Sequence, residues 1–304
     1  MIKKLPLVVP VALALSSAQS LELTATVAPI ASLVEQVAGQ PVQILIPASE
    51  SPHYFNMRMS QRALIEQSDL VFWVGESLET PIAAALSKMP NAVSLADKDV
   101  DLHDEHGHEG HGHEEHGHEE HGHEEHGHEE HDHDNAHPWL SIEESEHLLN
   151  IIAAELSRID SANQAQYERR ANDAIERLHA LEAGFKSATA PMKSVPYWVM
   201  HDAYGPFEAD MGIRRAGVIQ ANVNVKPTAK ELANLRQQVQ GGGCIFNEPQ
   251  MDARWIDLVA KESNISVLTL DPLGTELASG PELHTQLLES IAASFAACAD
   301  SVTQ

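Results

Sequence analysis

The sequence predicts an α/β protein of two lobes, each built on a parallel-type sheet and joined by one long connector helix. In both halves of the 304-residue chain, short apolar runs alternate with segments of helical periodicity, as in βαβ units. Between the halves, residues 161–190 carry one uninterrupted helical pattern. Because open α/β sheets bind ligands beyond the carboxyl ends of their strands, we expect a metal or ligand site in the cleft between the lobes.

The N-terminus has the pattern of an export signal. Lys3 and Lys4 precede an apolar run over 5–15 that gives way to small and polar residues. These eleven residues are too few to span a bilayer, and no other segment is long and apolar enough. The mature chain is therefore expected to be exported and soluble, without direct membrane insertion. The predicted domains are a signal peptide at 1–20, an N-terminal lobe over 21–160, the connector helix over 161–190 and a C-terminal lobe over 191–304.

The N-terminal lobe begins as strand, helix, strand. In residues 21–27 the polarity of the side chains alternates as in a strand. The helix that follows carries Pro29 in its first turn and ends at Gly39. A β-branched run at 42–46 is the second strand. The further elements predicted here are helices over 60–67 and 78–89 and strands over 70–74 and 93–95.

A histidine-rich tract over 101–136 interrupts this lobe. From His106 it repeats His-Gly-His-Glu-Glu, and it contains no lysine, arginine or aromatic residue. It cannot bury enough apolar surface to fold, so we predict a disordered loop. Imidazole nitrogen binds zinc, nickel and copper well, which makes the loop an auxiliary metal site. Its histidines are His103, His106, His108, His111, His113, His116, His118, His121, His123, His126, His128, His131 and His133.

The charge of the chain is concentrated in the same tract. The formal net charge is −26, but 14 of the 45 acidic residues lie between Asp101 and Asp134. The remainder has 31 acidic against 19 basic residues, a net charge of −12. An acidic chain is not attracted to nucleic acid or to an anionic membrane, so neither is expected as a partner.

Two long helices follow the tract. Ser141, three residues before Glu144, has the pattern of a capping box and opens a helix over 142–159. The connector helix over 161–190 carries apolar residues at steps of three and four. Nearly thirty helical residues would extend about 40 Å, enough to cross the whole molecule.

The C-terminal lobe repeats the alternation. Thr228 and Glu231 cap a helix that ends at Gly241. In an exported protein, Cys244 and Cys298 are expected to form a disulfide, because they lack the spacing of a zinc site. The other predicted elements are strands over 195–200, 217–219, 244–246 and 267–270 and helices over 203–211, 251–263 and 282–297.

Three histidines and one aspartate stand where the cleft should be. His53 follows the strand 42–46, His201 follows the strand 195–200, and Asp271 follows the strand 267–270, while His137 precedes the capped helix. Three imidazoles and one carboxylate would give a tetrahedral site that suits zinc. Each position alone is weak evidence for a metal ligand. The aspartate, for example, precedes a proline, and Asp at such a position usually forms a turn. His147, His179 and His284 fall within helices and are not expected to be ligands.

Five short runs carry a resemblance: Ser-Pro-His-Tyr-Phe-Asn-Met-Arg at 51–58, Asp-Leu-Val-Phe-Trp-Val-Gly at 69–75, Asn-Ala-His-Pro-Trp-Leu-Ser at 135–141, His-Asp-Ala-Tyr-Gly-Pro-Phe at 201–207 and Leu-Asp-Pro-Leu-Gly at 270–274. In this order they resemble the periplasmic zinc-binding proteins, the solute-binding components of high-affinity ABC-type zinc importers. The match extends over essentially the whole mature chain. The resemblance implies two α/β lobes bridged by a long helix, with zinc as the transported ligand held by His53, His137 and His201. It also implies a periplasmic, non-enzymatic monomer whose partners are the membrane permease subunits of the importer.

Several alternatives stay open at this stage. Manganese-binding relatives typically carry a glutamate where this chain has His201, so the imidazole favours zinc. Asp271 is the first choice as fourth ligand, with water or Glu50 as alternatives. The histidine-rich loop could collect and pass on zinc or sense its concentration. The alternative functions are a periplasmic zinc buffer or metallochaperone, and a manganese or iron importer component.

Overall fold

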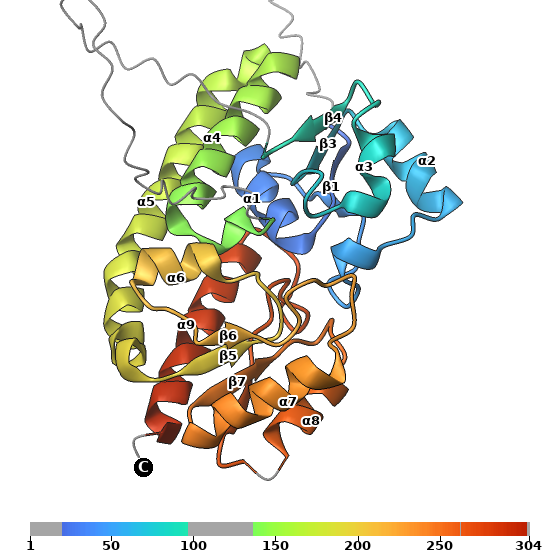
Figure 1. Ribbon diagram of the computed structural model, residues 1–304. Coiled ribbons are helices and arrows are strands. Elements are labelled where there is room, and N and C mark those ends of the chain that lie inside the picture. The colour runs from blue at the N-terminus through green and yellow to red at the C-terminus, as the bar shows by residue number, and fades with distance from the viewer. Residues whose placement is uncertain (1–19, 97–135, 262, 303–304) are drawn as a thin grey trace, which may run out of the picture.

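The computed structural model describes residues 20–96, 136–261 and 263–302, and it contains two four-stranded parallel sheets (Figure 1). We call the parts around them the N-lobe and the C-lobe. In the N-lobe sheet the strand order is β2-β1-β3-β4, and in the C-lobe sheet it is β6-β5-β7-β8. The two lobes thus repeat one topology, and the predicted α/β class with parallel sheets is confirmed. The strands are β1 (Leu23–Ala25), β2 (Gln43–Ile44), β3 (Leu70–Trp73), β4 (Ala92–Ser94), β5 (Tyr197–Val199), β6 (Gly217–Val218), β7 (Cys244–Asn247) and β8 (Ser266–Thr269).

Nine helices of the described residues surround the sheets, and most lie within a few residues of their predicted bounds. The predicted helix over 78–89 is shorter, and the last helix extends five residues beyond its predicted end at 297. The helices are α1 (Ala28–Ala38), α2 (Met59–Gln67), α3 (Thr80–Leu86), α4 (Ile142–Ile159), α5 (Gln164–Thr189), α6 (Gly205–Met211), α7 (Ala229–Gln238), α8 (Arg254–Ala260) and α9 (Leu283–Val302).

Local chemistry explains where several of these helices begin and end. Ser141 accepts a hydrogen bond from the Glu144 N–H at 3.1 Å, as the predicted cap of α4 requires. Thr228 and Glu231 form the predicted capping box of α7. Gly39 ends α1 with φ of 70°, a left-handed conformation that glycine adopts without strain.

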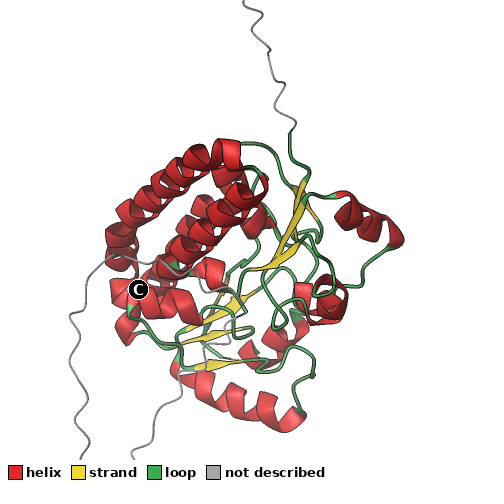
Figure 2. Cartoon of the chain, turned by 90° about the horizontal axis from the view of Figure 1, so that it is seen from above, coloured by secondary structure: helices red, strands yellow, loops and turns green. Residues whose placement is uncertain are grey.

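The connector helix α5 is part of a helical layer. It packs along α4 and also contacts α1 and α9, and Figure 2 shows the two long helices side by side on one flank of the sheets. One buried apolar cluster runs through this layer, from Leu23 in β1 to Ala299 in α9. The two lobes therefore share a core and are not linked by α5 alone.

The predicted disulfide is present in the C-lobe. Cys244 at the start of β7 is bonded to Cys298 in α9, at a sequence separation of 54 and with 6.0 Å between their Cα atoms. The bond ties the central part of the C-lobe sheet to the last helix.

Two predicted segments lie outside the described residues: the signal peptide at 1–20, except for its last residue, and the histidine-rich loop over 101–136, except for its last residue. Among the residues that the structure describes, no helix combines the length and apolar character needed to cross a membrane.

Candidate metal centre

The parallel topology brings the site residues to one edge of each sheet. His201 lies two residues beyond β5, and Glu248 comes directly after β7, its neighbour in the sheet. Asp271 lies two residues beyond β8, which pairs with β7. From the N-lobe, His53 lies in a single 3-10 turn (Pro52–Tyr54) in the loop after β2. His137 directly precedes another such turn (Pro138–Leu140) that leads into α4.

Three imidazoles converge between the lobes. One nitrogen from each of His53, His137 and His201 lies within 4.8 Å of the other two. The Nε2 atoms of His137 and His201 are 3.3 Å apart. Nitrogens about 2.0–2.1 Å from a tetrahedral zinc ion would stand about 3.3 Å from each other, so this spacing matches one edge of a zinc tetrahedron.

Burial favours the neutral form of two of these imidazoles, His53 and His137. His137 and His201 are almost fully buried, and His53 is half-buried. Burial, with a smaller effect of the neighbouring His201, lowers the pKa of His53 from 6.5 to about 4. The same causes, joined by His53, hold the pKa of His137 well below its ordinary value. Only a neutral imidazole has a lone pair for a metal, so the site is prepared to bind a cation at neutral pH.

The His53 side chain supports the same conclusion. Its Nε2 atom is buried and has no hydrogen-bond partner among the described residues. Buried polar atoms without partners are uncommon in folded proteins, because losing hydration without compensation is costly. A metal ion between the three rings would supply the missing partner.

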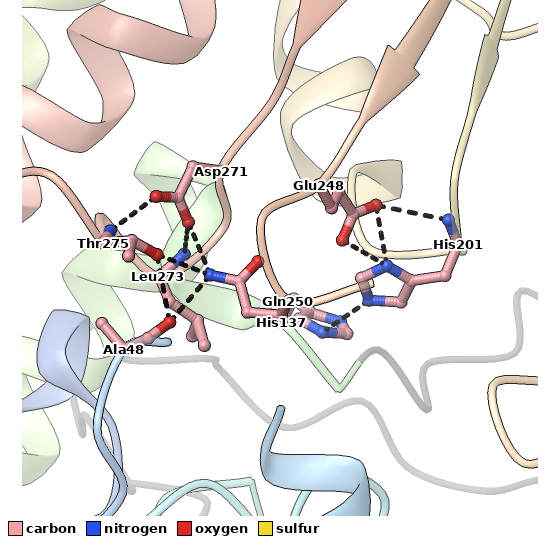
Figure 3. A network of polar contacts seen from close by, with 8 residues as sticks. All are labelled: Ala48, His137, His201, Glu248, Gln250, Asp271, Leu273 and Thr275. Carbon is pink, nitrogen blue, oxygen red and sulfur yellow. Dashed lines mark hydrogen bonds and ion pairs between the residues drawn. The ribbon is translucent and has the colours of Figure 1, made fainter. Parts of the chain in front are cut away.

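Glu248 orients the His201 ring (Figure 3). The Nδ1 atom of His201 lies 2.8 and 2.7 Å from the two carboxylate oxygens of Glu248. A proton on Nδ1 leaves the lone pair on Nε2, the atom that faces His137. Carboxylates that hold the second nitrogen of a ligating histidine fix its tautomer and raise its basicity. The sequence patterns did not reveal Glu248, which stands two residues after the predicted strand 244–246, whereas His201 and Asp271 directly follow their predicted strands.

Asp271, the predicted fourth ligand, is not among the groups brought together by the structure. Its Oδ1 atom accepts hydrogen bonds from the N–H groups of Leu273 and Gly274 at 3.0 and 3.1 Å, and its Oδ2 atom accepts one from the Thr275 N–H. The carboxylate thus organises the turn after β8, as Asp commonly does before Pro. The alternative, Glu50, forms an ion pair with Arg58 at 3.7 Å.

Two other histidines outside the tract, His284 and His179, contact groups that are not part of the three-histidine cluster. His284 is fully buried, and its Nε2 atom lies 2.7 Å from the carbonyl oxygen of Trp139. Burial lowers the pKa of His284 to about 4. His179 is exposed and lies 3.0 Å from Glu146 on α4. These positions agree with the expectation that the two are not ligands.

Trp139 fixes the segment that carries His137. Its indole Nε1 donates a hydrogen bond to the Pro272 carbonyl at 2.8 Å, and the side chain is fully buried. The ring of His137 packs edge-on against Trp139. This segment therefore holds its position by contact with the C-lobe turn at 270–274.

The three imidazoles open onto a pocket of about 740 Å³, which Ser77, Asn222 and Asn224 also line. Arg215 lines the pocket as well, but its guanidinium pairs with Glu208 at 2.7 Å and with Asp202. These acids offset the positive charge of Arg215, which would otherwise repel a metal cation on its way to the imidazoles.

Sequence comparison identifies the family of the chain. The family described as zinc-uptake complex component A, periplasmic (ZnuA), matches residues 23–298. The chain belongs to the ZnuA family. This match confirms the predicted zinc-uptake component and the prediction that the chain is not an enzyme.

Individual ZnuA proteins resemble the chain over most of its length. The high-affinity zinc uptake system protein ZnuA of Brucella abortus (strain 2308) is 34% identical over 296 residues, covering 88% of both chains. The protein of the same name from Haemophilus influenzae (strain ATCC 51907 / DSM 11121 / KW20 / Rd) is 31% identical, covering 97% of this chain and 99% of the relative. A solved crystal structure of ZnuA superposes with a TM-score of 0.70 at 20% identity, covering 91% of this chain and 100% of the other. That structural likeness supports the fold.

Proposed function

We propose that this chain captures zinc in the periplasm and delivers it to the membrane permease of an ABC-type importer. His53, His137 and His201 hold the ion. The observation that carries the proposal is the convergence of these three imidazoles in a pocket between the lobes. The names of the ZnuA relatives, high-affinity zinc uptake system proteins, support zinc as the cargo.

The donor set suits capture and release. Three neutral nitrogens bind zinc strongly, and borderline-soft imidazole favours it over manganese. Because the Asp271 carboxylate accepts hydrogen bonds from its own turn, a water molecule from the pocket completes the tetrahedron in this proposal. A solvent ligand leaves one face of the ion accessible for transfer.

The rest of the chain serves this site. The signal at 1–20 directs export and is removed, and the mature chain acts as a monomer of two lobes over 21–160 and 191–304. The histidine-rich loop over 101–136 is an auxiliary zinc collector that raises the local concentration of the ion near the pocket. Because a histidine must be neutral to bind a metal, zinc held by this loop is released as the pH falls below about 6.5 in this proposal.

The test separates the loop from the three-histidine site. In a chain lacking residues 103–133, zinc stoichiometry and affinity are measured by competition with a chelator. We expect one tightly bound zinc per chain. Replacing His53, His137 or His201 by Ala should weaken binding more than about 100-fold, the upper range for loss of a residue that merely supports a ligand.

His179→Ala is the matched control, because this histidine is exposed and contacts Glu146, which is not part of the three-histidine cluster. It should bind zinc like the parent chain. Tight binding that survives all three site substitutions would refute the proposed ligands.

A further inference from the structure

A second polar network lies beside His137 and His201 and connects the lobes (Figure 3). Its centre is the side-chain amide of Gln250, in the loop after β7. The Nε2 atom lies 2.8 Å from the Ala48 carbonyl oxygen and 2.8 Å from Asp271 Oδ1. It also lies 2.9 Å from Thr275 Oγ1, whose hydroxyl donates to the same Ala48 carbonyl at 3.1 Å. Ala48 belongs to the N-lobe, whereas the other three residues belong to the C-lobe.

The orientation of this amide is determined by its surroundings. Reversing it would place Oε1 against the Ala48 carbonyl and the Asp271 carboxylate, two groups that only accept hydrogen bonds. Asp271 is itself held by the N–H groups of its turn, so it is a firm anchor for Gln250. The network therefore ties the main chain of the N-lobe to the C-lobe in one geometry.

The position of the network relates it directly to the zinc ligands. Gln250 stands two residues after Glu248, which holds His201, and a turn from Glu248 to Met251 closes that loop with a 3.1 Å hydrogen bond. Ala48 stands five residues before His53, and it lies within another turn, in which the Glu50 N–H is 2.8 Å from the Pro47 carbonyl. The network is thus one hydrogen-bonded turn away from Glu248, which holds His201 in the C-lobe, and one short loop away from His53 in the N-lobe.

We propose that Gln250 is a positioning residue that fixes the distance between His53 and His201 and so governs how long zinc is retained. Asp271 acts with it as an anchor instead of a ligand. The inference rests on the proposed function, because it takes the three imidazoles as the zinc site. Opening the Gln250 link would let the loop that carries His53 move away from His201, which gives a path for release.

The variant Gln250→Ala removes the link, and Gln250→Glu keeps the side-chain shape but replaces the donor by a group that repels Asp271. In the chain lacking residues 103–133, we expect Gln250→Ala to accelerate zinc dissociation about tenfold, the factor for losing one or two hydrogen bonds. Gln250→Glu should accelerate it further. Both should still bind one zinc. Thr275→Val, which removes the second donor to Ala48, should have a smaller effect.

Gln61→Ala is the matched control. Gln61 donates its amide to the Leu45 carbonyl at 2.9 Å, in the same loop after β2, but both partners lie in the N-lobe. It should release zinc within about twofold of the parent rate, since neighbouring sites that are not coupled to the ligands leave binding unchanged. Parent-like dissociation from both Gln250 variants, or equal acceleration by Gln61→Ala, would overturn the inference.

A metal-free measurement separates this inference from the proposed function. In the zinc-free chain, Gln250→Ala should speed amide hydrogen exchange in both segments 47–53 and 247–252, whereas Gln61→Ala should affect at most the first. Unchanged exchange in both segments would reject the link even if the chain bound no zinc. Failure of the parent chain to bind zinc would reject the proposed function alone.

Discussion

At the scale of residues, the site depends on the imidazoles of His53 and His137, which are difficult to protonate. Burial lowers the pKa of His53 to about 4 and holds the pKa of His137 well below its ordinary value of 6.5. A lowered pKa means that the neutral, metal-binding form persists as the solution becomes acidic. Zinc must therefore compete with protons at His53 only near pH 4 and below, and at His137 only well below pH 6.5, whereas it competes near pH 6.5 at ordinary histidines.

This difference predicts the pH dependence of zinc binding. Between pH 7.5 and 5.5, the affinity of the chain lacking residues 103–133 should fall by no more than about tenfold. Three ordinary imidazoles, each about one-tenth neutral at pH 5.5, would lose about a thousandfold. Chelator competition at the two pH values measures the change. A loss near a thousandfold would show that the cluster titrates like exposed histidines.

The convergence of His53, His137 and His201 could be predicted because each stands next to a recognisable element. His201 follows an apolar strand, and His53 follows another strand through one loop. Glu248 could not be assigned in this way, because its contact with His201 requires β5 and β7 to be neighbours in the sheet. Strand order is set by the packing of the whole lobe and cannot be predicted from the spacing of residues along the chain.

Asp271 shows the opposite case. Its place after a strand was predicted, but the direction of its carboxylate depends on the turn that follows. Backbone N–H groups at 273–275 and the amide of Gln250 occupy its oxygens. A sequence pattern indicates the position of a residue along the chain. It does not indicate which of several nearby donors will hydrogen-bond to its side chain.

At the scale of elements, the disulfide between β7 and α9 supports the strand that leads to Glu248. The helix bounds were predicted well where caps mark them, as at Ser141 and Thr228. The packing of α5 against α1, α4 and α9 was not predicted, because amphipathic periodicity identifies a buried face but not the element that covers it.

The disulfide should contribute measurably to stability. Closing a loop across 54 residues restricts the unfolded chain, which is worth about 4 kcal/mol if loop entropy dominates. The double variant Cys244→Ala/Cys298→Ala should lower the free energy of unfolding by about that amount in urea titrations of the zinc-free chain. Reduction of the parent chain should give a similar decrease. A change below about 1 kcal/mol would mean that the bond restricts little in the unfolded state.

At the scale of the whole molecule, the two lobes are joined by more than a connector. The buried apolar cluster continues from the N-lobe strands through α4 and α5 into α9. The Trp139 indole and the Ser32 hydroxyl each donate a hydrogen bond to a carbonyl in the 270–284 region, at 2.8 and 3.0 Å. A hinge motion would have to break this shared core, and packed cores resist continuous deformation.

We therefore expect zinc binding to leave the overall shape nearly unchanged. In the chain lacking residues 103–133, zinc-free and zinc-bound X-ray scattering should give the same radius of gyration, about 18 Å for a compact chain of that length. Backbone shifts should be about 1 Å or less, as in other preorganised binding sites. The His53→Ala variant with added zinc serves as the unliganded control. A clear contraction on binding zinc, absent from that variant, would show that the lobes close by a hinge and that local release through the Gln250 loop is not the only movement available to the protein.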